Sequence, residues 1–327
     1  MVLAAGLGLR MRPLTLLRAK PALPVLNRPL LHWTLERLAR HGVTDAVVNL
    51  HHLPETVKAA VGDGSALGVR VRYSFEETIL GRGGGPRLVR DFFGDEPFLL
   101  VNGDVVFDFD ISHLVACHEV KGARVTMALR PNPDPRVYGP VVTGPDGRVR
   151  SVAGRPRLAR GTVSLFTGVQ VLDPALLDRL PDGASDILDL YGPLVEEGAL
   201  LRGLRVRGAW SDLGAPPLYL AAQLRLLARR RESALVHALA RVDRTARVEG
   251  SVVGARARVG AGALVRRSVL WEDAVVEAGA RVRGSIVTDG AVVGPREQAT
   301  GVMVFARGAL PPGQGETRRD AAWVTMS

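Results

Sequence analysis

One stretch decides the fold of the C-terminal third of the chain: residues 251–300 read SVVGARARVGAGALVRRSVLWEDAVVEAGARVRGSIVTDGAVVGPREQAT. The pattern repeats every 17 residues, and within a period the large aliphatic residues stand six, six and five positions apart. The in-register aliphatic sets are Val242, Val259, Val276 and Val293; Val248, Val265 and Val282; and Val253, Leu270, Val287 and Val304. Alanines and serines recur at the same period. The spacing predicts a coil with three flat sides whose turns stack on one another.

This three-sided coil resembles the left-handed parallel β-helix of hexapeptide-repeat proteins, and its handedness comes from that resemblance and not from the spacing. We expect it over residues 234–307, followed by a tail over residues 308–327 that is loose or covers the open edge. Stacked coils offer flat contact faces, so we expect a homo-oligomer to form through the β-helix. Acyl transfer on the coils is an alternative function, but it usually needs a histidine base, and the last histidine, His237, precedes Ala240, where the repeat begins.

Composition excludes several classes of protein. The chain has 327 residues, of which 46% are hydrophobic and 23% charged, so it is not a disordered chain. No apolar run approaches the ~18 residues of a membrane span. The N-terminus carries its first charge after the apolar stretch, which is the wrong order for a secretory signal. The single cysteine, Cys117, excludes a disulfide framework and a multi-thiolate metal site. Together these features predict a cytoplasmic protein.

The chain is basic, with a formal net charge of +10. Of the 43 basic residues only three are lysines, namely Lys20, Lys58 and Lys121, which indicates a general preference for arginine. Aromatic residues make up 5% of the chain, so the basic surface lacks the stacking side chains of a nucleic-acid interface. We therefore expect no nucleic acid and no membrane among its partners.

Residues 1–233 alternate short apolar runs with helical patterns, which predicts α/β layers around a mixed, mostly parallel sheet. The expected strands lie at 46–50, 69–73, 98–102 and 125–129, and the expected helices at 30–41, 54–61, 111–120 and 186–197. Asp110 and Ser185 precede two of these helices and are the types of residue that cap a helix N-terminus. The first strand, around Leu3, is unusually short. Either it is stunted, or the true start lies two or three residues upstream.

A glycine-rich stretch follows the first strand and reads LAAGLGLRMRPLT over residues 3–15. Glycines at this place let backbone N–H groups approach phosphates closely. Arg10 and, a little further on, Lys20 supply fixed positive charge. Such a turn suits a triphosphate, which carries several negative charges.

This segment resembles the signature of the sugar-1-phosphate nucleotidylyltransferases, also called NDP-sugar pyrophosphorylases. Further resemblances follow in chain order. ILGRGGG at 79–85 is similar to the family's second glycine loop, and VNGD at 101–104 to its Gly-Asp metal motif. Segments at 138–139 and 166–171 resemble its sugar pocket, and WSDLG at 210–214 its second metal motif. The resemblance covers nearly the whole chain, since mannose-1-phosphate guanylyltransferases also carry a left-handed β-helix.

The resemblance implies a Rossmann-like nucleotidyltransferase domain over residues 1–233. With the help of Mg²⁺, it would transfer a nucleotidyl group from a nucleoside triphosphate to a sugar 1-phosphate and release pyrophosphate. Mannose 1-phosphate with GTP is the first expected pair, and UTP, dTTP or ATP are the alternatives. By the same resemblance, the catalytic residues are Arg10, Lys20 and Asp104. The nucleotide-binding residues are Leu3, Ala4, Ala5, Gly6, Gly8, Gly81 and Gly83. The sugar-binding residues are Gly139, Arg155 and Gly168, and the metal ligands are Asp104 and Asp212.

Three positions depart from the family pattern. Leu9 stands where the family carries a hydroxyl residue, Arg82 replaces a small or hydroxyl residue, and Gly154 replaces a glutamate of the sugar pocket. These changes leave open a second hypothesis, a regulatory homologue that binds a sugar nucleotide and turns it over weakly or not at all. A pyrophosphate-release assay distinguishes the two.

Overall fold

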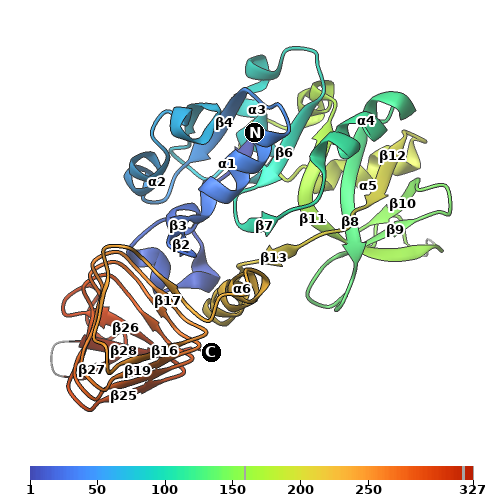
Figure 1. Cartoon of the computed structure of the whole chain (residues 1–327). Coiled ribbons are helices and arrows are strands. Elements are labelled where there is room, and N and C mark those ends of the chain that lie inside the picture. Colours follow the sequence, from blue (N-terminus) through green and yellow to red (C-terminus); the bar gives the residue numbers. More distant parts are fainter. Residues whose placement is uncertain (158–159, 319–320, 327) are drawn as a thin grey trace. The chain divides into compact units, whose positions relative to one another are not determined.

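The computed structural model describes residues 1–157, 160–318 and 321–326. The chain forms two compact units, each drawn in Figure 1. Unit 1 consists of Met1–Leu7 and Leu31–Ser211, and unit 2 of Gly8–Leu30 and the chain from Asp212 onward. The expected boundaries at 233 and 307 stay predictions, because compact units group residues by contact and not by continuity along the chain.

Unit 1 is organised around a mixed sheet, to which nine strands among the described residues contribute. The strands are β1 (Val2–Leu3), β4 (Asp45–Leu50), β5 (Arg70–Phe75), β6 (Phe98–Asn102), β8 (Val125–Pro131), β9 (Pro140–Thr143), β10 (Val149–Val152), β11 (Thr162–Leu172) and β12 (Leu201–Arg205). The order is β10-β9-β11-β6-β1-β4-β5, with β8 pairing to β11 and β12. The half around β1 is parallel, and the strands next to β11 run antiparallel to it. The expected fold class is confirmed, and β1 is short, as predicted.

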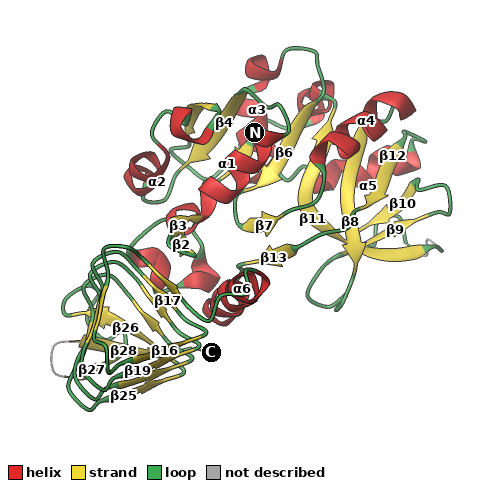
Figure 2. Cartoon of the chain, in the orientation of Figure 1, coloured by secondary structure: helices red, strands yellow, loops and turns green. Residues whose placement is uncertain are grey.

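Helices lie between successive strands of unit 1, as Figure 2 shows. They are α1 (Leu30–Arg40), α2 (Pro54–Val61), α3 (Gly81–Leu88), α4 (Ile111–Lys121) and α5 (Leu188–Glu196). Asp110 caps α4 as predicted, because its carboxylate accepts the N–H of His113 at 3.1 Å. The predicted cap at Ser185 is wrong. Helix α5 begins at Leu188, whose N–H donates to Asp186 at 3.0 Å, and the backbone of Ser185 bonds to α3 instead.

A two-stranded ribbon leaves the main sheet of unit 1 after β6. It pairs β7 (Val105–Phe107) with β13 (Trp210–Asp212), whose first two residues belong to unit 1. The N–H of Asp108 donates to the carbonyl of Ala209 at 3.1 Å and extends this pairing. The ribbon begins directly after Asp104, one of the predicted metal ligands.

Unit 2 begins with a loop of short turns. The loop contains η1 (Leu9–Met11), η2 (Leu14–Leu16), η3 (Lys20–Ala22) and the strand pair β2 (Pro24–Val25) and β3 (Arg28–Pro29). Later in the chain, unit 2 contains the helix α6 (Pro216–Arg229). The buried side chains of Met11 and Leu14 anchor the loop in the unit's interior. This compact packing explains why an N-terminal segment groups with the C-terminal part of the chain.

The remainder of unit 2 is a parallel β-helix with three sheets. The first sheet contains β14 (Leu235–Val236), β17 (Val252–Val253), β20 (Val269–Leu270), β23 (Ile286–Val287) and β26 (Val302–Ala306). The second contains β15 (Arg241–Val242), β18 (Arg258–Val259), β21 (Val275–Val276) and β24 (Val292–Val293). The third contains β16 (Arg247–Glu249), β19 (Leu264–Arg266), β22 (Arg281–Arg283) and β25 (Gln298–Thr300). Val242 pairs with Val259 and Val248 with Val265, so the 17-residue register read from the sequence is confirmed.

The sides of the coils bury aliphatic residues such as Val259, Val265 and Leu270, and serines add a ladder of hydrogen bonds. The N–H of Ser268 donates to the hydroxyl of Ser251 at 3.1 Å, and that of Ser285 to the hydroxyl of Ser268 at 3.1 Å. The C-terminal segment then folds back as β27 (Glu316–Arg318) and β28 (Ala321–Thr325), and β28 pairs antiparallel with β26. This pairing covers the edge of the last coil, one of the two outcomes that the sequence left open for the tail.

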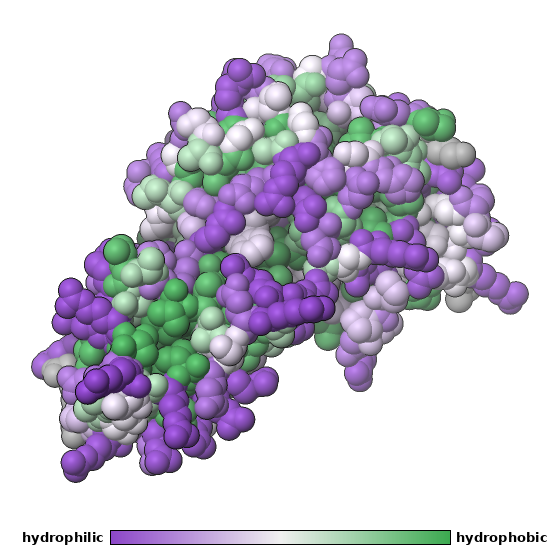
Figure 3. Space-filling model, in the orientation of Figure 1, coloured by the Kyte–Doolittle hydropathy of each residue, from purple (hydrophilic) through white to green (hydrophobic). Residues whose placement is uncertain are grey.

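In Figure 3 the surface of the coils is mixed: purple, polar side chains lie along its edges, and a green, apolar area lies between them. In the part of the chain that the structure describes, no helix is both long enough and apolar enough to cross a membrane.

Candidate active site

Two expected site residues of unit 1, Leu3 and Asp104, lie where strands β1 and β6 end side by side. Leu3 pairs with Asn102, and the N–H of Gly103 donates to the carbonyl of Leu3 at 2.9 Å. A Cβ atom at position 103 would lie 2.6 Å from that carbonyl oxygen, so only glycine permits this approach. Strand order reverses at β1, since β4 lies on one side and β6 on the other. Such a switch point is where open α/β sheets bind ligands, and Asp104 emerges there.

The first glycine stretch divides into a buried and an open part. Ala4 and Ala5 are buried, whereas Gly6 is exposed and a Cβ atom built on it would meet no described atom within 4 Å. Open space beside an exposed glycine is what close approach of a phosphate to the backbone requires. Leu9, the departure from the family pattern, is 56% exposed and therefore presents an apolar side chain to solvent.

Two residues that the sequence reasoning missed hold this stretch in place. Asn49, on β4, accepts the N–H of Ala4 at 2.7 Å and donates to Glu76 at 2.7 Å. Glu76, which is 1% exposed, also accepts the N–H of Leu80 at 2.8 Å. One buried relay thus links the first glycine stretch to the start of α3. A polar residue inside the apolar run of β4 was the only sequence signal for it.

The predicted second glycine loop is a helix. Gly81 opens α3 with φ +75°, and the glycines that follow are buried. A Cβ atom on Gly83 would lie 2.8 Å from the hydroxyl of Ser185, and one on Gly85 2.5 Å from the carboxylate of Glu76. The glycines therefore permit close packing of α3. The N–H of Gly83 already donates to Ser185, so any nucleotide contact of Gly83 has to use another atom.

Arg82, the second departure from the family pattern, has an ion-pair partner. Its guanidinium forms an ion pair with the carboxylate of Asp186, and the Nε–Oδ2 distance is 3.1 Å. Both side chains are partly exposed. The pair fixes the arginine against the segment before α5, a contact that no sequence pattern indicated.

The residues predicted to bind the sugar lie on β11 and in the region of β9 and β10. Gly168 lies at an irregularity in the pairing of β11 with β8, where φ is +82° and a Cβ atom would lie 2.8 Å from the side chain of Asn102. Next to it, the Trp210 ring nitrogen donates to the carbonyl of Thr167 at 2.8 Å. Gly168 therefore lies beside the end of β6, the strand that leads to Asp104.

The other two sugar-side residues lie apart from β11. Arg155 forms a bridge with Val152, and its Cβ atom lies 3.0 Å from the Cβ position of Gly192 on α5. Gly139 is exposed, and Gly154 has open space where the family's glutamate would stand.

Gly8 and Lys20, which are predicted to contact phosphates, lie close to each other within unit 2. Gly8 adopts φ +60°, and a Cβ atom there would lie 2.8 Å from Thr15 Cγ2 and 3.5 Å from Lys20 Cβ. The hydroxyl of Thr15 donates to the carbonyl of Gly8 at 3.0 Å and closes the loop. Lys20, which begins η3, is 8% exposed. Gly8, before η1, and the buried Lys20, at the start of η3, therefore lie side by side.

Arg10 and Asp212 also come together in unit 2 although 202 positions separate them in the sequence. They flank Gly214, since a Cβ atom at that position would lie 3.0 Å from Asp212 Oδ2 and 3.3 Å from Arg10 Nη2. By the resemblance, Arg10 is a catalytic residue and Asp212 is a metal ligand. A glycine between a guanidinium and a carboxylate leaves room for both groups to act on one ligand.

Among residues 1–157, 160–318 and 321–326 no group of three or more histidine, cysteine, aspartate or glutamate side chains is placed to hold a metal ion. Mg²⁺ does not require one, because it is commonly bound by one or two carboxylates together with substrate phosphates and water. Asp104 directly precedes β7 and Asp212 ends β13, the two strands of the ribbon. The donor types present fit Mg²⁺ on this chemical ground.

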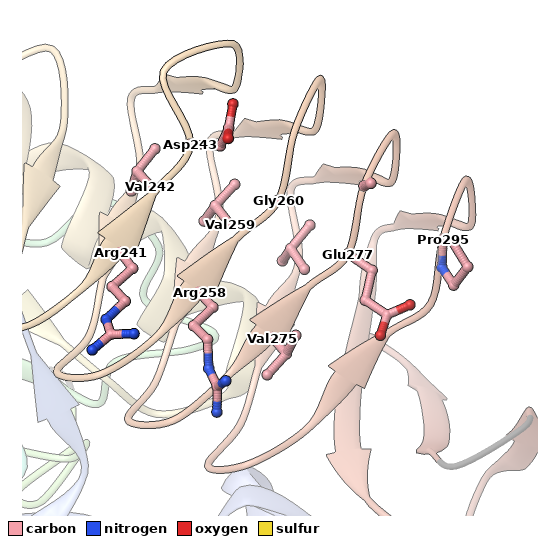
Figure 4. A pocket seen from close by; sticks show the side chains of 11 residues that line it. Arg241, Val242, Asp243, Arg258, Val259, Gly260, Val275, Glu277 and Pro295 are labelled. Atoms are coloured by element: carbon pink, nitrogen blue, oxygen red, sulfur yellow. The ribbon is translucent and has the colours of Figure 1, made fainter.

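A hollow of about 590 Å³ lies on the second sheet of the coils (Figure 4). Arg241 and Arg258 extend from neighbouring coils along it, and Glu277 lies further along. The described residues that line it include carboxylate and guanidinium groups but no imidazole. It therefore offers none of the histidine bases that the acyl-transfer alternative would use.

Both the N-terminal and the C-terminal part of the chain match known protein families. Residues 1–229 match the family model described as Nucleotidyl transferase, and residues 230–304 match the one described as GlmU-like, C-terminal hexapeptide. The UTP–glucose-1-phosphate uridylyltransferase of Synechocystis sp. is 33% identical over 235 residues, which cover 67% of this chain and 61% of that protein. The mannose-1-phosphate guanylyltransferase of Mycobacterium tuberculosis is 33% identical over 218 residues, 66% of this chain and 60% of that protein. The chain thus spans about 60% of the length of these relatives.

A solved structure has the same fold. A crystal structure assigned to a glucose-1-phosphate thymidylyltransferase of Bacillus anthracis superposes with a TM-score of 0.61 and 22% sequence identity, covering 69% of this chain and 93% of that chain. At this identity the likeness supports the fold alone.

Proposed function

Because the chain belongs to the nucleotidyl transferase family, we propose that it transfers a nucleotidyl group from a nucleoside triphosphate to a sugar 1-phosphate, with release of pyrophosphate. The observation that carries the proposal is the convergence of Gly8, Lys20, Arg10 and Asp212 in one compact unit. Among them are two kinds of cation for a polyphosphate and a carboxylate for a metal.

The proposed reaction is a direct displacement and needs no covalent intermediate on the enzyme. A phosphate oxygen of the sugar 1-phosphate forms a bond to the α-phosphorus, and the bond from the α-phosphorus to the bridging oxygen of the β-phosphate breaks. Pyrophosphate leaves with that electron pair. The attacking phosphate is already ionised, so no side chain has to remove a proton. Catalysis therefore depends on positioning and on neutralising charge.

In this proposal each cation has its own part. The guanidinium of Arg10 holds the departing pyrophosphate, because its planar fork matches phosphate oxygens in pairs. The ammonium of Lys20 lies as a point charge between the two reacting phosphates, which are the sugar phosphate and the α-phosphate of the triphosphate. The backbone of residues 3–8 borders the triphosphate, and Gly81 borders the nucleotide on the α3 side. Loss of one such preorganised donor costs about 10²–10³ in rate.

Asp104 and Asp212 are the proposed ligands of Mg²⁺. When bound, Mg²⁺ neutralises the negative charge of the phosphate oxygens that react and leave. These two carboxylates would hold the ion together with the substrate phosphates. Gly139, Arg155 and Gly168 are the proposed sugar-side residues.

We propose mannose 1-phosphate and GTP as the first pair to test. A guanylyltransferase and a uridylyltransferase are equally identical to this chain, so UTP with glucose 1-phosphate is the second pair, followed by dTTP and ATP. The test is a matrix of these triphosphates against common sugar 1-phosphates, with pyrophosphate release as the readout. Asp104→Ala is then measured on whichever pair reacts, and it should release at least about 10²-fold less pyrophosphate.

A non-catalytic homologue is the second candidate function. It is favoured by the exposed Leu9, by the engagement of Arg82 with Asp186, and by the open space at Gly154. In the same matrix this candidate predicts saturable binding of a sugar nucleotide, measured by calorimetry, without pyrophosphate release from any pair.

We also propose that the coils mediate self-association. The flat sheets of a β-helix give self-complementary faces for a symmetric dimer or tetramer. Sedimentation of the full chain tests this, and a single monomeric species at micromolar concentration would contradict it.

A further inference from the structure

Residues 18–27, here called the Lys20 segment, are attached by side-chain contacts to α6 and to the coils. The side chain of Asn27 donates to the carbonyl oxygen of Val253 at 2.9 Å. The side chain of Gln223, on α6, accepts the N–H of Leu26 at 3.0 Å. These contacts join an N-terminal segment to elements that lie about two hundred residues later in the chain.

Two buried aromatic residues reinforce the attachment. Tyr219 of α6 donates its hydroxyl proton to the carbonyl of Pro24. The ring nitrogen of Trp271, on the coils, donates to the Tyr219 hydroxyl at 3.1 Å. The chain of contacts therefore runs from the coils through α6 to the end of the turn that begins at Lys20.

The charged contact lies at the other end of the segment, two residues before Lys20. Arg18 forms an ion pair with Asp289, with 2.8 Å between Nη2 and Oδ2, and Glu272 lies 3.8 Å from the same nitrogen. The guanidinium also lies 5.8 Å from the centre of the Trp271 ring. All three partners are on the coils.

Arg18 and Asp289 depend on each other. Burial raises the pKa of the Asp289 carboxyl, and its buried Oδ1 has no hydrogen-bond partner among the residues that the structure describes. The nearby positive charge of Arg18 acts in the opposite direction and favours the carboxylate. A partly buried ion pair with few other partners is sensitive to the loss of either member.

The turn that carries Lys20 is short, since η3 spans only Lys20–Ala22. Its backbone bonds are the N–H of Ala22 to the carbonyl of Ala19 at 2.9 Å and the N–H of Leu23 to that of Lys20 at 3.2 Å. A lysine side chain that acts as a point charge has to be placed within about 1 Å, because a misplacement of that size can cost about 10²-fold in rate. The position of the turn must therefore be set from outside it.

We propose that Arg18 is a positioning residue: by binding Asp289, Glu272 and the Trp271 ring, it fixes the turn that begins with Lys20, so that the coils set the geometry of nucleotidyl transfer. This inference rests on the proposed function, in which Lys20 contacts the reacting phosphates. It gives the β-helix a part in the reaction itself, in addition to any part in self-association.

The test compares Arg18→Met with Arg256→Met as the matched control. Arg256 also pairs with Glu272, and its second partner, Asp273, lies on the coils as well. We expect Arg18→Met to lower kcat by about tenfold or more, with KM for both substrates changed by less than about twofold. Arg18→Lys keeps the charge and should recover part of the rate, and Arg256→Met should leave kcat unchanged.

A double-mutant cycle with Lys20 separates positioning from general destabilisation. In a Lys20→Met background the ammonium is gone, so Arg18→Met should cost no further rate. Equal rate losses in the two backgrounds, or a kcat of Arg18→Met within about twofold of the unmodified protein, would overturn the inference. If Arg18→Met does not fold, Asp289→Asn, which keeps the side-chain volume, takes its place in the cycle.

A measurement without substrate distinguishes failure of this inference from failure of the proposed function. Amide hydrogen exchange at Leu23, whose N–H donates to Lys20, should be at least about tenfold faster in Arg18→Met and unchanged in Arg256→Met. Unchanged exchange in Arg18→Met would refute the positioning role whatever the activity. Faster exchange, together with an unmodified protein that releases no pyrophosphate from any pair, would instead refute the proposed function.

Discussion

The side chain of Asn49 donates a buried hydrogen bond of 2.7 Å to Glu76, which lies 27 residues further along the chain. The same asparagine accepts the N–H of Ala4, and the same glutamate accepts the N–H of Leu80. The first glycine stretch and the start of α3 are therefore held by one polar relay, at the edge of the sheet where parallel strands end. Neither side chain needs to touch a ligand to matter for the site.

Asn49→Ala should lower the free energy of unfolding by about 1–3 kcal/mol, because it leaves the N–H of Ala4 and the carboxylate of Glu76 buried with fewer partners. Urea denaturation measures the change. Asn132→Ala is the control, since Asn132 bonds to the carbonyl of Tyr138 in a partly exposed loop and should cost less than about 1 kcal/mol. Equal losses for the two variants would contradict the importance of the buried relay.

Gly8→Ala should lower both stability and kcat. A left-handed backbone costs a non-glycine residue about 1–2 kcal/mol, and the new methyl group would also lie 2.8 Å from Thr15 Cγ2, beside Lys20. Gly42→Ala has the same backbone strain, with φ +85°, and open space, so it should lower stability and leave kcat unchanged. Adding Thr15→Ser to Gly8→Ala removes the clashing methyl group and should restore part of the rate. A Gly8→Ala variant with the kcat of Gly42→Ala would refute the close fit of this loop.

Much of this architecture is readable from the sequence. The 17-residue period fixes the register of the coils because each side pairs only with the coils above and below it. The strand and helix pattern of residues 1–233 fixes the layers, since apolar runs mark the buried strands. Asp110 could be predicted as a helix cap because capping is a local interaction.

The sequence-based predictions that were wrong concern contacts between segments that lie far apart in the sequence. Glycine costs a helix about 1 kcal/mol per residue, so the stretch at 79–85 predicted a loop. Helix α3 forms there because only glycine lets it pack closely against Ser185 and Glu76. The backbone of Ser185 bonds to α3 for the same reason and does not start α5. No local pattern could show this, or that Arg18 would meet Asp289.

Removal of divalent metal with a chelator should abolish pyrophosphate release, and Mg²⁺ should restore it. Asp104→Asn and Asp212→Asn should each raise the Mg²⁺ concentration for half-maximal rate by about tenfold or more, since each removes a charged ligand. Asp95→Asn, a change at a fully exposed aspartate, should leave the requirement unchanged. If all three variants shared one Mg²⁺ requirement, the two proposed ligands would be wrong.

The stability of unit 1 should fall as the pH falls below about 6.5, the ordinary pKa of histidine. His118 is 3% exposed, its ring nitrogen Nδ1 lies 3.0 Å from the Thr126 hydroxyl, and burial lowers its pKa. The unfolded chain therefore binds the proton more readily, and this contribution to stability, complete above pH 6.5, is lost as the pH falls through the lowered pKa. Titration of this one group changes the free energy of unfolding by at most about 1.4 kcal/mol per pH unit.

His118→Gln should flatten that slope when unfolding free energies are measured by urea titration between pH 5 and pH 8. His113→Gln, a change at an exposed position of the same helix, should leave the slope as it is. A slope that persists in His118→Gln would assign the pH dependence to another group.

The most direct test of the account follows the label from a nucleoside triphosphate labelled at its α-phosphorus. With the reacting sugar 1-phosphate and Mg²⁺, the account predicts that the label appears in a nucleoside diphosphate sugar in a 1:1 ratio with released pyrophosphate. The label should stay in the triphosphate when the sugar 1-phosphate is left out. If the label appeared only in free nucleoside monophosphate, or if no pair of substrates moved it, the account would be contradicted.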